Sequence, residues 1–499
     1  MERINKIDTL NRVKLTANIL FSGIGCQERG FENSGLFDLE VLNTSDINKD
    51  AVVSYAAVHC GLTKEMIENY SDYPSREKMA AYLKVINLGY EPEKNKSYDW
   101  DKLARRKSND IEKYWLACKL SNNLGDISKI EKLPYADLWT CSFPCTDISL
   151  AGKMKGLSPS DSTRSSLLWE NIRLLKMAKD DGTLPKYIMF ENVKNLVGKK
   201  FINDFNNLLS VLDELGFNSY WKVLNAKNCG VPQNRERVFV ISIRKDIDNG
   251  AFVFPKPFDT GIRLKDILDE NVDEKYYFSE KIIKGFQKHN ENHKSKGTGF
   301  IWKPKTDEDI ANTLRANSAL CPTDNSIKEL GQLYGTKKEP NPQAGRVYNK
   351  DFISPTIDSC SGGNRMPKIC MPINASEDGT ARTIKAQYSK TSKANFEYQG
   401  TYGATGVAVD YGANIYRIRK LTPNECWKLM GLTEIDCAKA IAIGVSDSQL
   451  YKQAGNGIVT NCCELLAEHL YKAQYDNTYT CTDEFRVANS CADKKERNV

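Results

Sequence analysis

The sequence predicts an α/β protein: a mostly parallel, doubly wound sheet with helices on both faces, plus a smaller domain rich in loops and strands. Two observations predict this class. Short apolar runs alternate with helical patterns through the first half of the chain, and such alternation is typical of parallel sheets. Residues 259–416 then change in texture, with frequent Gly, Asn, Ser, Pro and Thr and only short apolar runs. The 499 residues leave room for both parts, since one domain commonly takes roughly 150 residues.

The elements of the first part follow in order. Strands are expected at residues 16–21, 39–45, 136–141, 186–191 and 237–243. Helices are expected at residues 25–33, from 48 onward, at 165–178 and at 201–215, where apolar residues recur at helical spacing. Ligands of such sheets bind beyond the carboxyl ends of the strands, so the residues that follow each strand are the candidates for a site.

An insertion and a return of the chain complete the organisation. Residues 62–123 interrupt the alternation with a charged, Tyr- and Lys-rich segment, which we expect to be a helical insertion in a domain spanning 14–255. Its aromatic residues are expected to form a small core, and packing, cover of a ligand site and contact with a partner are open roles for it. Residues 417–472 return to the first domain, and 473–499 form a polar tail.

Composition excludes several classes of protein. No run approaches the roughly 18 apolar residues of a membrane span, and residues 1–14 lack the apolar core of a secretory signal. The 15 cysteines, without such a signal, indicate reduced thiols and a cytoplasmic protein. With only four histidines there is little material for His-based metal chemistry, and no metal is predicted.

Positive charge is concentrated in one segment. Residues 281–420 hold 22 Lys and Arg against 13 Asp and Glu, in a chain whose net charge is +6. This excess predicts either a polyanionic partner or an ordinary solvated basic surface.

Three sites after strands suggest a cofactor that contains adenosine. Phe21, Gly23 and Gly25 lie at a strand-to-helix turn, where glycines let the backbone approach a ligand and the helix offers free N–H groups. Asp46 follows the next strand, where an acid often bonds ribose hydroxyls, and Asp126 precedes a later apolar run. Plain structural turns are the alternative interpretation.

Three further sites carry reactive side chains. Cys145 follows Pro144 directly after a strand, and Glu191 stands at the end of the next one, where a carboxyl beside a thiolate can act as a general acid. Arg235 and Arg237 precede the last strand and share one face of an extended segment. A buried structural thiol and a solvated basic strand are the alternatives.

The order of these blocks resembles a known family. FSGIG, SD, GDI, SFPCTDISLAG, ENV, QNRER, RKLTPNE and QAGNGIV follow one another as in the cytosine-C5 DNA methyltransferases of bacteria and phages. The resemblance covers about residues 14–250 and 417–470. It implies a Rossmann-like domain that uses S-adenosylmethionine, with a target-recognition domain at 259–416. It also implies double-stranded DNA as partner, base flipping, and a place in a restriction-modification system with a cognate endonuclease or as an orphan or phage enzyme.

The resemblance assigns the roles in catalysis. Cys145 matches the nucleophile that attacks carbon 6 of cytosine, and Glu191 matches the acid that bonds ring N3 and the exocyclic amine. Of Arg235 and Arg237, one would bond the cytosine carbonyl oxygen and the other would hold the catalytic groups. Thr146 replaces a frequent Gln after the nucleophile.

The resemblance also assigns the cofactor contacts. Phe21 would pack near the adenine with Gly23 and Gly25 under the methionine, Asp46 would take the ribose hydroxyls and Asp126 the adenine amine. The remaining contacts would be Pro144 and Leu168 at the methyl group and Asn456 and Gly457 at the methionine end. Asp46 stands where Glu is more common, and Gly457 where Ser is more common.

The DNA contacts stay open within the resemblance. Family members carry a Thr-Leu-like dipeptide in the recognition domain, and Thr313, Thr356 and Thr383 all qualify. Residues 149–162, with Lys153 and Lys155, would form a lid that closes over the flipped base or else a passive loop. Competing interpretations are an RNA methyltransferase, a non-catalytic DNA-binding regulator, and a dehydrogenase, for which the third glycine is missing.

Overall fold

The computed structural model describes residues 12–92, 94–106, 108, 110–144, 148, 167–297, 301–314, 325–330, 347–349, 368–370 and 416–476. These residues divide into two compact units. The first contains the described residues up to Ile262, Thr313 with Leu314, and those from Pro423 onward. The second contains the described residues of Arg263–Asn312 and Ala319–Thr422.

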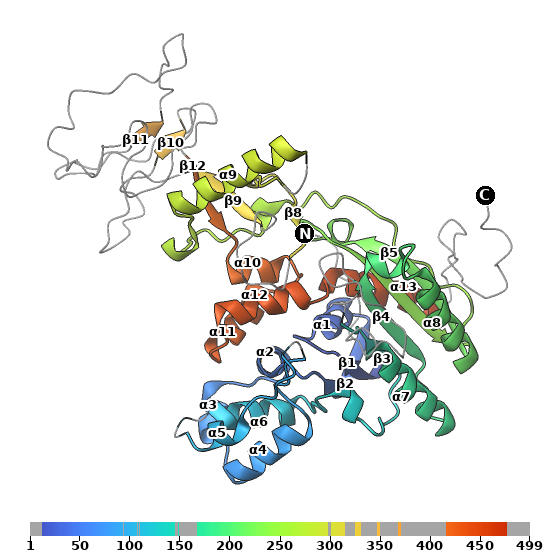
Figure 1. Ribbon diagram of the computed structural model, residues 1–499. Coiled ribbons are helices and arrows are strands. Elements are labelled where there is room, and N and C mark those ends of the chain that lie inside the picture. Colours follow the sequence, from blue (N-terminus) through green and yellow to red (C-terminus); the bar gives the residue numbers. More distant parts are fainter. Residues whose placement is uncertain are drawn as a thin grey trace, which may run out of the picture. The chain divides into compact units, whose positions relative to one another are not determined.

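A six-stranded sheet with the order β2-β1-β3-β4-β7-β5 forms the centre of the first unit (Figure 1). Its strands are β1 (Val13–Leu20), β2 (Phe37–Ser45), β3 (Leu138–Cys141), β4 (Tyr187–Val193), β5 (Phe217–Asn225) and β7 (Glu236–Arg244). The pairs β1–β2, β1–β3 and β3–β4 are parallel, whereas β7 runs antiparallel to β4 and β5. The prediction of a mostly parallel α/β sheet is confirmed.

The edge strand β5 is an element that the sequence analysis did not predict. It follows α8 (Ile202–Leu215) after the single residue Gly216, whose φ is 105°. Its buried and half-buried positions alternate only imperfectly along the strand, because an edge strand has one neighbour and need not be apolar throughout. The other predicted strands are all present, with ends shifted by a few residues.

Helices cover the sheet of the first unit. α7 (Leu168–Asp180) and α8 share one apolar core with β3 and β4, which includes Trp139, Ile188 and Leu212. α2 (Lys49–His59) begins after Asn48, whose side chain accepts hydrogen bonds from the N–H groups of Asp50 and Ala51. The other helices of this unit outside the insertion are α1 (Cys26–Asn33), α10 (Pro423–Lys428), α11 (Glu434–Ala442), α12 (Asp447–Asn456) and α13 (Thr460–Tyr475).

The predicted insertion is helical and lies together as one group (Figure 1). It comprises α3 (Lys64–Asn69), α4 (Arg76–Val85), α5 (Trp100–Ala104) and α6 (Asp110–Leu120). Trp100, Tyr114 and Trp115 are buried, and the rings of Trp100 and Tyr114 lie 5.3 Å apart. The expected aromatic core is therefore confirmed.

The second unit contains a long helix that the sequence analysis assigned to loops and strands. Few side chains of α9 (Glu280–Lys296) are apolar, and two of them, Ile283 and Phe286, pack with Phe278, Trp302 and Ile418. β9 (Ser326–Leu330) pairs antiparallel with β12 (Tyr416–Lys420), and β10 (Val347–Asn349) pairs in parallel with β11 (Lys368–Cys370). Because β12 pairs with β9, residues 417–422 group with this unit rather than the first. No helix among the described residues is long and apolar enough to cross a membrane.

Candidate active site

The chain leaves β1 through a tight turn that leads into α1. Phe21, Gly23 and Gly25 have φ angles of 57°, 55° and 77°, and Gly25 immediately precedes the helix. A bulky residue rarely adopts such an angle, so the turn is locally strained at Phe21. Asp46 holds it, because its Oδ2 accepts a hydrogen bond from the Gly23 N–H at 2.9 Å.

Asp46 directly follows β2, and both of its carboxylate oxygens serve the backbone. Oδ1 accepts the Asn48 N–H at 2.7 Å, while Oδ2 accepts that of Gly23. Burial raises the pKa of Asp46, whereas these two bonds act in the opposite direction. A carboxylate oxygen has two lone pairs, so each oxygen keeps one for the hydroxyl of a ligand.

Asp126 lies where the insertion meets the sheet. Its Oδ1 accepts from the N–H and hydroxyl of Ser128 at 3.0 and 2.8 Å, and its Oδ2 accepts from Asn87 Nδ2 at 2.7 Å. The Asp126 N–H donates to the Ile86 carbonyl at 2.9 Å, and a Cβ on Gly125 would lie 1.9 Å from that carbonyl oxygen. The insertion therefore packs directly on the segment that carries Asp126.

Two asparagines from the end of β4 and the residues after it anchor the segment that follows β3. Asn192 Nδ2 donates to the Phe143 carbonyl at 2.9 Å, and Asn195 Nδ2 donates to the Ile148 carbonyl at 2.5 Å. Pro144 is half-buried between the anchors. Cys145 comes next in the sequence and lies outside the described residues, so the structure fixes the chain on both sides of it.

Glu191 and Arg237 form a buried ion pair across β4 and β7. Arg237 Nε lies 3.2 Å from Glu191 Oε1, and the two side chains are only 16% and 10% exposed. Burial raises the pKa of Glu191, and the positive charges of Arg237 and Arg235 partly offset this effect. The pair places a carboxyl that can hold a proton beside a guanidinium that can donate hydrogen bonds.

The Arg235 side chain binds backbone carbonyl groups. Its residue is 3% exposed, and its guanidinium donates to the carbonyls of Leu314, Gly455 and Gly457 at 3.1, 3.1 and 2.7 Å. Its neighbour Gln233 binds the same stretch, since its Oε1 accepts the Leu314 N–H at 3.0 Å. Arg235 thus connects the segment before β7 to the segments around Leu314 and around Gly455 and Gly457. It differs from Arg237, which binds a carboxylate rather than the backbone.

The residues at the end of α12 lie beside the first turn. A Cβ on Gly457 would sit 3.2 Å from the Gln453 carbonyl oxygen and 3.4 Å from Cys26 Sγ. The Gln453 side chain in turn binds Ser54 Oγ and the Asp50 carbonyl, both at 3.0 Å. Asn456 and Gly457 are thereby brought to the same edge as Gly23 and Gly25, and the space that a serine would need is narrow.

The remaining predicted residues are distributed unevenly. Leu168 is buried at the start of α7. Thr313 is described, and its hydroxyl donates to the Asn234 carbonyl at 2.6 Å. Four predicted DNA contacts lie outside the described residues: Lys153, Lys155, Thr356 and Thr383.

The described cysteines offer little reactivity. The nine whose side chains the structure describes are free thiols, and all of these except Cys60 are buried. Burial raises the pKa of Cys26, Cys60 and Cys118 to about 12, so these thiols stay protonated and are poor nucleophiles.

Three positioning residues were missed by the sequence analysis: Asn87, Asn192 and Asn195. Asn192 belongs to the ENV block, and an amide next to Glu191 at the end of a strand could have indicated a positioning role. Asn87 had none, because its partner Asp126 is 39 residues away in the sequence and only the folded insertion joins them.

Known proteins resemble this chain over most of its length. The family model described as C-5 cytosine-specific DNA methylase matches residues 77–472. The Type II methyltransferase M2.ScrFI of Lactococcus lactis subsp. cremoris is 34% identical, covering 91% of this chain and 98% of that protein. The orphan methyltransferase M.Rho11sI of Bacillus phage rho11s is 29% identical, covering 92% and 98%. Among solved structures, the Entamoeba histolytica methyltransferase EhMeth aligns with a TM-score of 0.49 at 15% identity, over 92% of this chain and 98% of that one.

Proposed function

The chain belongs to the family of C-5 cytosine-specific DNA methylases, and from that premise we propose its reaction in detail. A methyl group passes from S-adenosylmethionine to carbon 5 of a cytosine that is flipped out of a specific duplex sequence. The step runs through a covalent bond between Cys145 Sγ and carbon 6 of the base. The observation that supports this most is the buried Glu191–Arg237 pair, because β4, which carries Glu191, pairs with β3, and Cys145 follows β3 in the sequence.

The pair suits a cytosine ring. Carbon 5 is a poor nucleophile until a thiolate adds to carbon 6 and turns the ring into an enamine. Burial raises the pKa of Glu191, so this carboxyl can give a proton to ring N3 as the thiolate adds. After methylation, a water molecule takes the proton from carbon 5, the double bond re-forms as the Cys145 thiolate leaves carbon 6, and N3 returns its proton to Glu191.

The two arginines then take separate roles. Arg237 lies against Glu191, and its planar fork is suited to the cytosine carbonyl oxygen. Arg235 donates to backbone carbonyls and would hold the site together without touching the base. The motif alone leaves this choice open, and these contacts support the proposed division of roles.

The edge formed by β1, β2 and the Asp126 segment fits the methyl donor. S-adenosylmethionine supplies an electrophilic methyl group when bound. Asp46 keeps free lone pairs for ribose hydroxyls, and an added Cβ on Gly23 would meet nothing within 4 Å, which leaves room there for the methionine. Phe21 and Asp126 would border the adenine, and Pro144, Leu168, Asn456 and Gly457 would close the donor pocket.

Residues 259–416 would recognise the DNA. The Lys and Arg side chains that are in excess in residues 281–420 would contact phosphates, which position a duplex, and base-edge contacts would specify it. Lys153, Lys155, Thr313, Thr356 and Thr383 remain the candidate contacts. One relative is named a type II and another an orphan methyltransferase, so a cognate endonuclease and a stand-alone role both accord with those names.

Sequencing of host DNA tests the proposal. Bisulfite or nanopore sequencing of cells with and without the gene should show 5-methylcytosine at one short motif, and Cys145→Ser should abolish the signal. Methylation of RNA alone, or of DNA at adenine, would contradict the proposal.

A further inference from the structure

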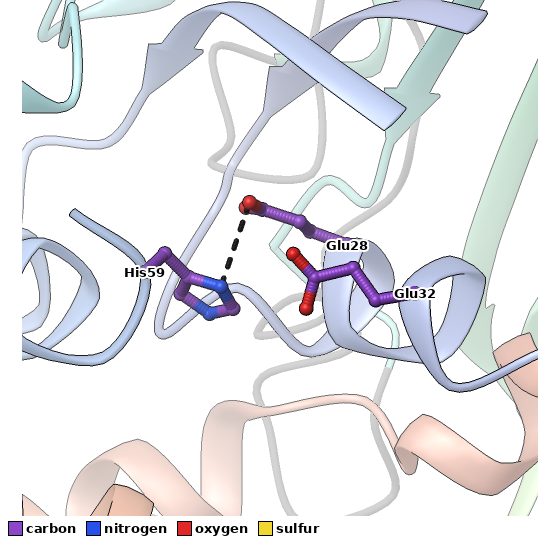
Figure 2. Close-up of side chains that lie close together, drawn as sticks. All are labelled: Glu28, Glu32 and His59. Carbon is purple, nitrogen blue, oxygen red and sulfur yellow. Dashed lines mark ion pairs between the residues drawn. The ribbon is translucent and has the colours of Figure 1, made fainter. Parts of the chain in front are cut away.

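A partly buried cluster behind the turn after β1, in which only Glu32 is exposed, has no role in the proposed reaction. Glu28 and Glu32 come from α1 and His59 from α2, and Figure 2 shows their side chains close together. Their nitrogen and oxygen atoms lie within 4.8 Å of one another. Glu28 is 7% exposed and the His59 side chain 2%. Buried titratable groups cluster at functional sites, so Glu28 and His59 are candidates for a functional role.

Hydrogen bonding fixes His59 in one tautomer. Its Nε2 lies 3.1 Å from the Ile24 carbonyl oxygen, and a carbonyl can only accept, so Nε2 carries a proton. The Nδ1 of the neutral ring then presents a lone pair toward Glu28 Oε1 at 3.5 Å, and it has no hydrogen-bond partner among the described residues. Two lone pairs would repel, so a proton must lie between these atoms.

The other oxygen of Glu28 is also engaged. The Tyr55 hydroxyl donates to Glu28 Oε2, which leaves Oε1 to face the ring. A chain of groups therefore runs from Tyr55 through Glu28 and His59 to the Ile24 carbonyl. Ile24 belongs to the turn that carries Gly23 and Gly25.

The ring is seated tightly against that turn. A Cβ on Gly25 would lie 2.1 Å from His59 Nε2, so only glycine permits the contact. The left-handed φ of Gly25 has the same requirement. A change in the position of the His59 ring would therefore change the conformation of the turn.

We propose that Glu28, acting through His59, is a positioning residue for the cofactor turn: a carboxyl proton on Glu28 holds His59 Nδ1, and His59 Nε2 in turn holds the Ile24 carbonyl. The inference rests on the proposed function, because it takes this turn to bind S-adenosylmethionine. It adds a proton-dependent support to that site.

The surrounding charges favour this arrangement. Arg29 on α1 pairs with Glu32 at 3.0 Å and with Asp436 on α11 at 2.8 Å, and its charge offsets only a small part of the effect of burial on the pKa of Glu28. Tyr55 and Cys60 on α2 and Lys439 on α11 are the other titratable groups nearby. Burial raises the pKa of Glu28 to about 8 and lowers that of His59 to about 4, so both are neutral near pH 7.

A metal ion on the three donors is the competing explanation. It would need Glu32, which already has the Arg29 guanidinium as partner, and a fully ionised Glu28, which accepts from Tyr55. A cation beside Arg29 is also electrostatically disfavoured. The proton chain satisfies the same atoms without these conflicts.

The dissociation constant of S-adenosylmethionine, measured on the full-length protein by calorimetry between pH 6 and 9, tests the inference. Wild-type affinity should weaken about fivefold or more as pH rises through about 8, since proton and cofactor binding are coupled. Glu28→Gln keeps a neutral donor for Nδ1 and should give a flat profile at the wild-type level. Glu28→Met, of similar size but without a donor, should bind weakly at every pH. Glu32→Gln serves as the matched control and should follow wild type.

Four outcomes would overturn the inference. These are a flat wild-type profile, equal affinity of Glu28→Met and wild type, weak binding by Glu32→Gln, and tighter binding or a higher Tm when Zn²⁺ or Mn²⁺ is added to wild type but not to Glu28→Gln. Failure of folded wild type to bind S-adenosylmethionine at any pH would instead remove the proposed function. The two failures are therefore distinguishable.

Discussion

The two edges of the candidate site are held by different kinds of bond. At the turn after β1, side chains bind backbone: Asp46 accepts two N–H groups and His59 holds the Ile24 carbonyl. At the ends of β4 and β7, Glu191 and Arg237 bind each other. The first arrangement fixes the backbone conformation of the turn, whereas the second is an ion pair whose hydrogen bonds a ligand can replace. Substitutions at the first edge should change affinity, and those at the second should change chemistry.

Loss of the Glu191 carboxyl should have the largest effect. Glu191→Gln keeps the size of the side chain but cannot transfer a proton, so single-turnover methylation of a cognate duplex should slow by about 10²–10⁴-fold. Affinity for S-adenosylmethionine should stay within about twofold, since the change lies at the other edge. Because burial raises the pKa of Glu191 and its protonated form is the reactive one, the wild-type rate should fall as pH rises through that pKa. Equal losses of methylation rate and of cofactor affinity in Glu191→Gln would contradict the assignment of chemistry to one edge and cofactor affinity to the other.

Substitution of Arg235 should mainly lower stability, whereas substitution of Arg237 should mainly slow methyl transfer. Arg235→Lys cannot reach three carbonyls at once, and the bonds lost should lower the free energy of unfolding by about 3 kcal/mol in urea titrations. Arg237→Lys should cost only about 1 kcal/mol because its side chain is less buried, yet it should slow methyl transfer more. The reverse ranking would assign the base contact to Arg235.

Asp46 should govern cofactor affinity. Asp46→Ala removes two acceptors from the turn, and the dissociation constant of S-adenosylmethionine should rise about tenfold. Asp38→Asn is the control, because Asp38 is exposed on the same strand. An unchanged affinity in Asp46→Ala would show that the turn is held by other contacts.

The insertion should have the smallest effect. Asn87→Ala frees one oxygen of Asp126 and should weaken cofactor binding about threefold, while Asn69→Ala, at an exposed position in the same insertion, should leave it unchanged. If both variants bind as wild type does, the insertion packs on the site without tuning it.

Local patterns in the sequence predicted the frame of the first unit. The β1 turn, the helix expected from residue 48 onward and the strand that carries Glu191 all depend on residues a few positions apart, and these features are present, although the strand extends to Val193. The edge strand β5 and the helix α9 were missed, because polar residues interrupt the apolar positions of β5 and few side chains of α9 are apolar.

Contacts between distant residues could not be read in the same way. Arg235 and Arg237 belong to one motif, and nothing local says that the first would bind carbonyls more than 200 residues away at Gly455 and Gly457. The pair formed by Asn87 and Asp126 is of the same kind. The cluster of Glu28 and His59 also needs two helices to be folded together.

The most direct measurement is covalent trapping on a duplex that contains 5-fluorocytosine at the modified position. Fluorine blocks loss of the carbon 5 substituent, so the enzyme should stay attached to DNA in the presence of S-adenosylmethionine, and peptide mapping should place the bond on Cys145. A bond to any other cysteine, or methylation without a trapped complex, would contradict the account.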